Sequence, residues 1–172
     1  MSQQTQNLMK KISLAKVVLN MGVGKSGEPI EIGKQTLGQI TGKKPNARKA
    51  KKAHRDWGVR KGEPIGIAVT VRGNDATELL KKLLVVKDNQ IAEKAFDNEG
   101  NLSFGIKEHI DIPGIKYDPK IGILGLEVSI SLARPGFSIK FNKSKAKVGK
   151  NHRITKNDAI KFLTEEFGVT VV

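Results

Sequence analysis

The sequence predicts an α+β fold with a single domain, in which a mainly antiparallel sheet packs one face on helices and leaves its other face uncovered. Two patterns predict it. Apolar residues alternate with small or polar ones in four segments, as in strands covered on one side: residues 16–24, 66–72, 102–110 and 126–133. Apolar residues recur at helical spacing in three others: 30–41, 75–86 and 156–167. Neither a repeat nor a Gly/Ser-rich linker interrupts the 172 residues, so we expect one domain, 1–172, with residues 1–10 flexible.

The predicted strands sort their side chains onto two faces. In the first strand the apolar face carries Val17, Leu19 and Met21. The opposite faces of the first two strands carry Lys16, Asn20, Thr70 and Arg72. In 102–110 the alternation places Phe104, Ile106 and Ile110 on one side, across from Ser103, Lys107 and His109. The polar sides of these strands are available for a partner other than the helices.

The predicted helices have recognisable ends. The first follows Pro29 and stops at Gly42, and the second repeats leucines between residues 79 and 84. The third begins with Thr155 and Asp158, the spacing of a capping box, and ends before Gly168. These three helices supply the cover that one face of the sheet requires.

Positive charge is concentrated in two segments. The chain has 31 Lys and Arg against 17 acids, a formal charge of +14. Residues 43–61 and 134–156 each carry +8, and the remainder is slightly acidic. Such clustering favours a binding site for a polyanion over two solvated loops, and nucleic acid is the commonest such partner of basic proteins. We find no basic amphipathic helix, lipid anchor, signal peptide or apolar run of membrane-spanning length, so we expect a cytoplasmic protein without membrane contact.

Catalytic motifs are weak. Gly24-Lys25-Ser26 matches the end of a phosphate-binding P-loop, but Leu19 occupies the position of the first glycine and continues the apolar face of the strand. A nucleotide-hydrolysing enzyme therefore stays only as an alternative, beside a basic adaptor for protein or membrane. The absence of Cys excludes Cys-based zinc sites. The three histidines, His54, His109 and His152, have neither the spacing of metal ligands nor a plausible catalytic partner. We expect no enzyme activity, metal or cofactor.

The two basic segments differ in character. Proline and glycine break up residues 42–66, which favours a long loop or irregular hairpin. Trp57 in this loop either packs or stacks at its base, or anchors it in the core. In the second segment, alternating Phe137, Ile139 and Phe141 predict a short strand before a Lys-rich excursion. With only eight aromatic residues in the chain, gripping folded RNA by phosphate, sugar and shape is favoured over base stacking.

An ordered series of motifs resembles a known family. It comprises KVVLNMGVG (16–24), ITGKKPNARKAKK (40–52), RKGEPIGIAVTVRG (60–73), GNLSFGIKEHIDIPGIKYD (100–118), RPGFSI (134–139) and HRIT (152–155). Together they resemble large-subunit ribosomal protein family five (eleven in the eukaryotic numbering), in its archaeal and eukaryotic branch. The resemblance implies a structural protein of the central protuberance that binds 5S rRNA on the exposed sheet face. It also implies contacts with P-site tRNA, 23S rRNA, neighbouring large-subunit proteins and a small-subunit head protein at an inter-subunit bridge.

The resemblance and the strand pattern together predict the site. On the 5S rRNA face we expect Lys16, Asn20, Lys43, Lys44, Thr70 and Arg72. Many relatives carry Gln where this chain has Lys43, which favours a phosphate contact there. The tRNA-contacting loop corresponds to residues 47–60, with Lys51, Lys52, His54, Arg55 and Trp57 as candidates. Further rRNA contacts are expected from Arg134, Lys143, Lys145, Lys147, Lys150, His152 and Arg153.

Overall fold

A computed structural model describes residues 7–24, 26–115, 123–141 and 147–172. A five-stranded sheet in the order β2-β3-β1-β6-β5 forms its centre, and every neighbouring pair is antiparallel. Its strands are β1 (Ser13–Gly22), β2 (Asn46–Lys49), β3 (Pro64–Val71), β5 (Leu102–Ile106) and β6 (Leu126–Ala133). The α+β fold predicted from the sequence is confirmed. Lys25, Lys143 and Lys145 lie outside the described residues, as do the first six.

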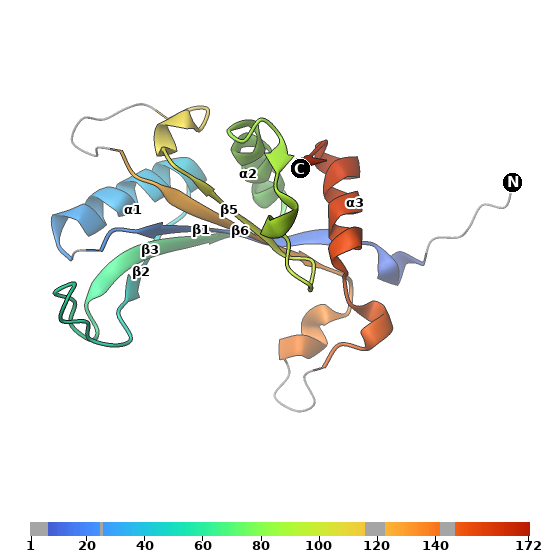
Figure 1. Cartoon of the computed structure of the whole chain (residues 1–172), viewed down its shortest axis with the longest axis horizontal. Coiled ribbons are helices and arrows are strands. Elements are labelled where there is room, and N and C mark those ends of the chain that lie inside the picture. Colours follow the sequence, from blue (N-terminus) through green and yellow to red (C-terminus); the bar gives the residue numbers. More distant parts are fainter. Residues whose placement is uncertain (1–6, 25, 116–122, 142–146) are drawn as a thin grey trace, which may run out of the picture.

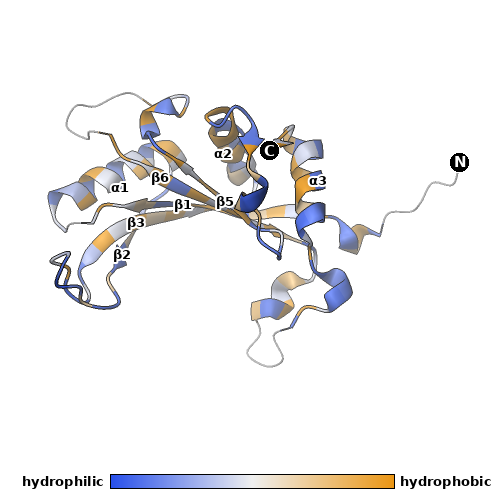
Figure 2. Cartoon of the chain, in the orientation of Figure 1, coloured by the Kyte–Doolittle hydropathy of each residue, from blue (hydrophilic) through white to orange (hydrophobic). Residues whose placement is uncertain are grey.

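The helices cover one face of the sheet (Figure 1). α1 (Glu28–Thr41) packs on β3 and α2 (Asn74–Val85) on β1, while α3 (Lys156–Phe167) lies toward the end of the sheet at which β1 begins. The core between the layers includes Leu19, Leu37 and Leu80, all fully buried. In Figure 2 hydrophobic residues are found on the helices and strands, whereas the loop after β2 is mainly hydrophilic.

The ends of the helices follow the sequence signals. Gly42 and Gly168 close α1 and α3 in the left-handed conformation, with φ of 63° and 66°. The capping box at the start of α3 is present: the Thr155 side chain accepts from the Asp158 amide, and the Asp158 carboxylate accepts from the Thr155 amide. Because these local bonds satisfy otherwise unpaired backbone groups, all three boundaries could be predicted without tertiary information.

Two of the predicted strands need correction. The strand at 102–110 ends at Ile106, and a 3₁₀ turn over His109–Asp111 buries the His109 ring to 1% exposure. The Leu124 amide donates to His109 Nδ1 at 3.3 Å, so this ring has a structural place in the core. The strand expected at 137–141 is a 3₁₀ helix, Phe137–Phe141. The turn at Pro135-Gly136 starts it, because the amides of Phe137 and Ile139 donate three residues back.

Three strands were not predicted. β2 is a short edge strand rich in polar residues, so it lacks the alternation that marks the others. β4 (Gln90–Ile91) and β7 (Thr170–Val171) form a separate parallel pair that joins the end of α2 to the end of α3. Two residues per strand are too few to produce a periodic pattern.

Candidate nucleic-acid interface

The face of the sheet opposite the helices carries polar and small side chains. We call it the bare face. The strand register places five residues side by side across it: Asn46, Ala68, Asn20, Glu127 and Gly105. The next row contains Thr70, Val18, Ser129 and Ser103. Small side chains dominate these rows, so a ligand can approach the backbone closely.

The predicted residues Asn20, Thr70 and Lys16 all belong to the bare face. Asn20 and Thr70 are half-buried between their neighbours, and Lys16 lies opposite Ser131 of β6. Arg72 is exposed just beyond the end of β3, and Lys44 is exposed between α1 and β2. The alternation of the sequence was sufficient to place the strand residues on this face, because successive side chains of a strand point to opposite sides.

Lys43 has a partner within the chain. Its Nζ lies 2.8 Å from Asp75 Oδ2 at the start of α2. The hydrogen bond from Lys43, reinforced by its positive charge, lowers the pKa of Asp75 below its usual value. Both side chains remain substantially exposed, so the pair is accessible to a ligand.

Asn46 and Arg48 are bare-face residues that the sequence reasoning missed. Asn46 lies opposite Ala68 and Arg48 opposite Gly66, and both are exposed. The signal that could have found them is the alternation Asn-Ala-Arg. It places Ala47, which lies opposite the core residue Ile67, on the covered side. The polar composition of the surrounding segment concealed this short strand.

The part of the first basic segment that follows β2 forms an irregular hairpin that leads to β3. The backbones of His54 and Val59 bond each other reciprocally, at 2.9 and 3.0 Å, and the residues from Lys51 to Gly58 are all exposed. Trp57 is 75% exposed and its ring centroid lies 4.9 Å from that of His54. The interpretation of Trp57 as a core anchor is therefore wrong, because its ring is exposed.

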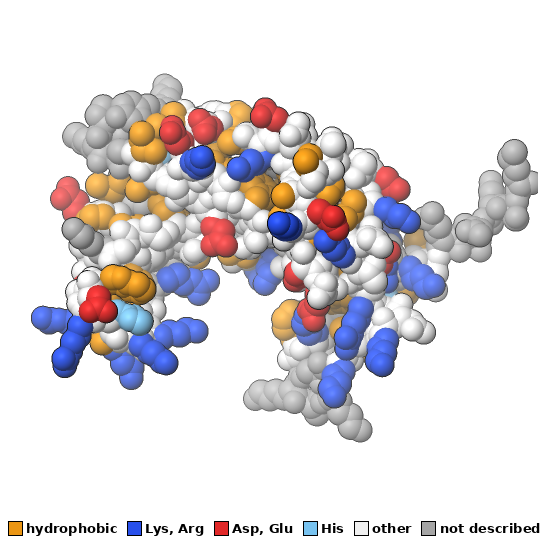
Figure 3. All heavy atoms as spheres, viewed as in Figure 1, with side chains coloured by type: hydrophobic (Ala, Val, Ile, Leu, Met, Phe, Trp, Pro, Cys, Tyr) orange, Lys and Arg blue, Asp and Glu red, His pale blue; other side chains and the backbone are white. Residues whose placement is uncertain are grey.

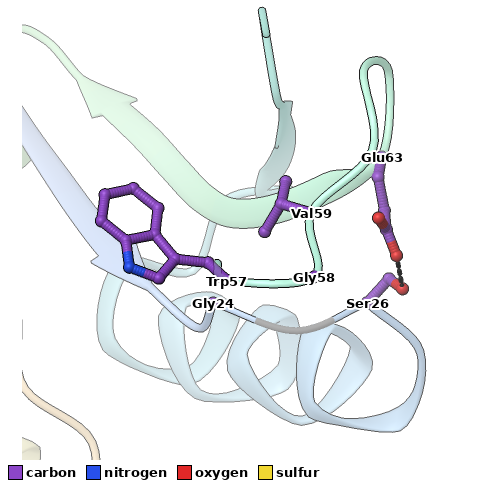
Figure 4. Close-up of a pocket in the computed structure, with 6 residues that line it drawn as sticks. All are labelled: Gly24, Ser26, Trp57, Gly58, Val59 and Glu63. Carbon is purple, nitrogen blue, oxygen red and sulfur yellow. Dashed lines mark hydrogen bonds between the residues drawn. The ribbon is translucent and has the colours of Figure 1, made fainter. Parts of the chain in front are cut away.

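A hydrogen-bonded brace fixes the base of this hairpin. Ser26 Oγ donates to the Glu63 carboxylate, and the Arg60 amide donates to the same group at 2.9 Å. These two hydrogen bonds, the one from Ser26 first, lower the pKa of Glu63. Figure 4 shows the brace beside a cavity of about 320 Å³ that Trp57 also lines, between the hairpin and the start of α1.

The geometry near Gly24 differs from that of a P-loop. β1 stays extended to Gly22, and the amides of Val23 and Gly24 both donate to the Ile65 carbonyl, at 3.0 and 2.9 Å. Those amides are thus committed to the sheet, whereas a P-loop needs free amides to surround phosphate. No candidate metal cluster of three His, Cys, Asp or Glu occurs among the described residues.

The second basic segment leaves β6 and returns to α3. Lys147, Lys150 and Arg153 are exposed, and His152 is half-buried. His152 Nε2 lies 2.8 Å from the Pro135 carbonyl oxygen. Arg134 behaves differently, because its guanidinium is turned inward and pairs with Asp158 at 3.1 Å.

Both basic segments project on the side of the sheet that carries no helix (Figures 1 and 3). In Figure 3, Lys and Arg side chains surround the hairpin at the lower left, and a second group lies at the lower right. The bare face thus lies between two cationic projections. This arrangement suits an anionic ligand with a broad, regular surface.

Acidification should remove the contribution of the Arg134–Asp158 pair to stability. Burial tends to raise the pKa of Asp158, but the hydrogen bonds from Thr155 and the Arg134 guanidinium outweigh it and hold the pKa below its usual value. A carboxyl group whose pKa is lower in the folded than in the unfolded protein stabilises the fold fully at pH values above its unfolded pKa, about 3.9 for Asp. This stabilisation is lost as the pH falls through the pKa of the folded state. We expect Asp158→Asn to lower the free energy of unfolding at pH 7 by about 1 kcal/mol. The effect is this small because water screens the partly exposed ion pair.

The measurement is urea unfolding, followed by circular dichroism, of both proteins between pH 7 and pH 3. The difference between them should shrink below about pH 4, because Asp158 is protonated first in the unfolded chain and only at lower pH in the folded parent protein. A difference that stayed constant over the whole range would contradict the assignment.

The fold and the interface define a class of protein: a small, basic α+β protein whose bare face lies between two cationic segments, an arrangement typical of nucleic-acid-binding proteins. Within the described residues, none of the helices is long and apolar enough to cross a membrane.

Comparison with known proteins identifies the family. Residues 7–60 match the model for ribosomal protein L5, and residues 64–162 match the model for the C-terminus of the same ribosomal family. The large ribosomal subunit protein uL5 of Nitrosopumilus maritimus is 64% identical over 99% of both chains. That of Cenarchaeum symbiosum is 59% identical over 95% of this chain and 98% of its own, and that of Sulfolobus acidocaldarius is 46% identical over 97% and 94%. The chain belongs to the ribosomal L5 family, and the resemblance drawn from its motifs is confirmed.

Proposed function

We propose that this protein is a structural constituent of the large ribosomal subunit that binds 5S rRNA on its bare face. The register that places Asn20 between Ala68 and Glu127, in a row of polar and small side chains, supports this proposal most directly. An RNA helix presents sugars and base edges in a wide, shallow groove. A face of small and hydrogen-bonding side chains fits that groove, and the cations at its margins reach the phosphates.

The two basic segments have separate partners in this proposal. The hairpin at 47–60 contacts P-site tRNA through Lys51, Lys52, His54, Arg55 and Trp57. Their exposure and the His54–Trp57 ring pair support a contact at the hairpin tip. The second segment contacts 23S rRNA and neighbouring proteins through its exposed cations. The family resemblance adds a bridge to the small-subunit head.

Crosslinking with mass spectrometry on purified ribosomes tests these assignments. We expect crosslinks from 5S rRNA near Asn20 and Thr70, and from tRNA near His54. Crosslinked peptides confined to residues 74–99, on the helix-covered side, would contradict the model of the bare face.

Binding of the purified protein to 5S rRNA provides the matching variant test. Asn20→Ala should weaken binding about tenfold, because a hydrogen bond at a desolvated interface contributes about 1 kcal/mol and its RNA partner is left unsatisfied. Asn98→Ala, which removes an exposed amide from the loop between α2 and β5, serves as the control and should bind as the parent does. Equal affinities for all three proteins would exclude Asn20 from the interface.

A further inference from the structure

Arg134 was expected to contact rRNA, but its side chain is only 11% exposed. Nη1 donates to the Arg153 carbonyl at 3.0 Å, and Nη2 donates to Asp158 Oδ2 at 3.1 Å. One guanidinium therefore joins the first residue of the second basic segment to its far end and to α3. The planar fork of Arg can hold two acceptors in fixed directions, which a Lys ammonium on its flexible stem cannot do.

Neighbouring contacts close the same junction. The Pro135 carbonyl can only accept, so the His152 Nε2 that lies 2.8 Å from it carries the proton. The His152 ring also packs edge-on against Phe137, with 5.7 Å between ring centroids. Asp158 Oδ2 accepts from the Thr155 amide as well as from Arg134. The helix cap of α3 and the closure of the segment thus share one carboxylate oxygen.

We propose that Arg134 is a positioning residue that joins the two described parts of the second basic segment, 134–141 and 147–156, and holds Lys147, Lys150 and Arg153 in place for rRNA, without itself binding phosphate. Because the Arg134 side chain is only 11% exposed, its guanidinium would have to move outward to reach a phosphate, and Asp158 would then lose the ion pair. A closed segment loses less conformational freedom when it binds, so closure raises affinity without adding a contact. The link to affinity rests on the proposed rRNA binding, whereas the closure can be measured in the free protein.

The sign of the effect of Asp158→Asn tests the proposal. Removing a negative charge from a protein that binds a polyanion should tighten binding if only net charge matters. If Asp158 and Arg134 hold the segment closed, the same substitution should weaken binding. We expect a loss on the order of tenfold, from the extra ordering that binding then requires. Glu166→Gln is the matched control on the same helix, because Glu166 is exposed and forms no ion pair among the described residues.

The experiment measures binding of deproteinised 5S and 23S rRNA to the full chain carrying Arg134→Lys, Asp158→Asn, both, or Glu166→Gln. Both single variants should bind one of the RNAs more weakly, and the double variant should be no weaker than the single ones. Circular dichroism confirms that each variant is folded. Unchanged or tighter binding by Asp158→Asn to both RNAs would overturn the proposal, as would additive losses in the double variant.

Hydrogen exchange separates failure of this proposal from failure of the proposed function. In the free protein, amides in 134–141 and 147–154 should exchange faster in Arg134→Lys and Asp158→Asn than in the parent or Glu166→Gln. Unchanged exchange in both variants refutes the closure whatever the RNA results. Faster exchange in both variants, together with a parent protein that binds neither RNA, would establish the closure but refute rRNA binding.

Discussion

Raising the salt concentration from about 50 to 200 mM should weaken binding of 5S rRNA by roughly 10³–10⁵-fold. The two basic segments contain seventeen Lys and Arg. Among the described residues, four of these cations are in ion pairs within the chain: Lys43, Arg134, Lys140 and Lys156. We expect about 6–8 phosphate contacts at once, each of which releases condensed counterions and so steepens the dependence on salt.

Equilibrium binding at four salt concentrations measures the slope. The double variant Lys81→Ala, Lys82→Ala is the control. It removes two positive charges that are exposed on α2, on the helix-covered side. That variant should keep the slope of the parent protein. A nearly flat dependence on salt in the parent would contradict binding by charge neutralisation, even if 5S rRNA binding itself were observed.

Gly100→Ala should destabilise the protein by about 2–5 kcal/mol. Gly100 has φ of +76°, and a Cβ there would lie 2.5 Å from Ile154 Cγ2 and 3.1 Å from Ile154 Cβ. The left-handed backbone costs an Ala about 1–2 kcal/mol, and overpacking costs roughly 1–3 kcal/mol more. Ile154 is 2% exposed and branched at Cβ, so it has little room to move away.

Gly58→Ala separates the two costs. Gly58 also has positive φ, +63°, but a Cβ there would meet nothing within 4 Å. When both variants are unfolded with urea, Gly58→Ala should therefore lower the free energy of unfolding only by the cost of the left-handed backbone. Equal losses for the two variants would show that contact with Ile154 contributes nothing. Because Ile154 lies near the end of the second basic segment, Gly100→Ala should also loosen that end of the segment.

The sequence predicted the larger elements because each repeats a pattern over several turns or pleats. Asn20 and Thr70 were placed on the bare face from alternation alone, and the register confirms that placement. Short or irregular elements carried no such signal. The alternation of Phe137, Ile139 and Phe141 is also typical of a strand. It does not indicate the preceding turn, after which the segment forms a 3₁₀ helix.

The candidate site was less predictable where side chains meet across the fold. The pairing of Lys43 with Asp75 and of Arg134 with Asp158 joins residues far apart in sequence. Charge clustering therefore identified both basic segments but could not distinguish a cation that faces outward from one that closes a loop. That distinction needed coordinates, because it depends on which acid the fold brings within reach.

The position of β1 in the middle of the sheet has a consequence for assembly. β1 can pair with β3 early, but its other edge must wait for β6, more than a hundred residues further along the chain. Such distant pairings form slowly. A partly synthesised chain thus displays its first cluster of positive charge before Asn20 has acquired its neighbours from β6. If the bare face binds 5S rRNA as proposed, the chain in that interval exposes its positive charge without the complete face that would select this RNA.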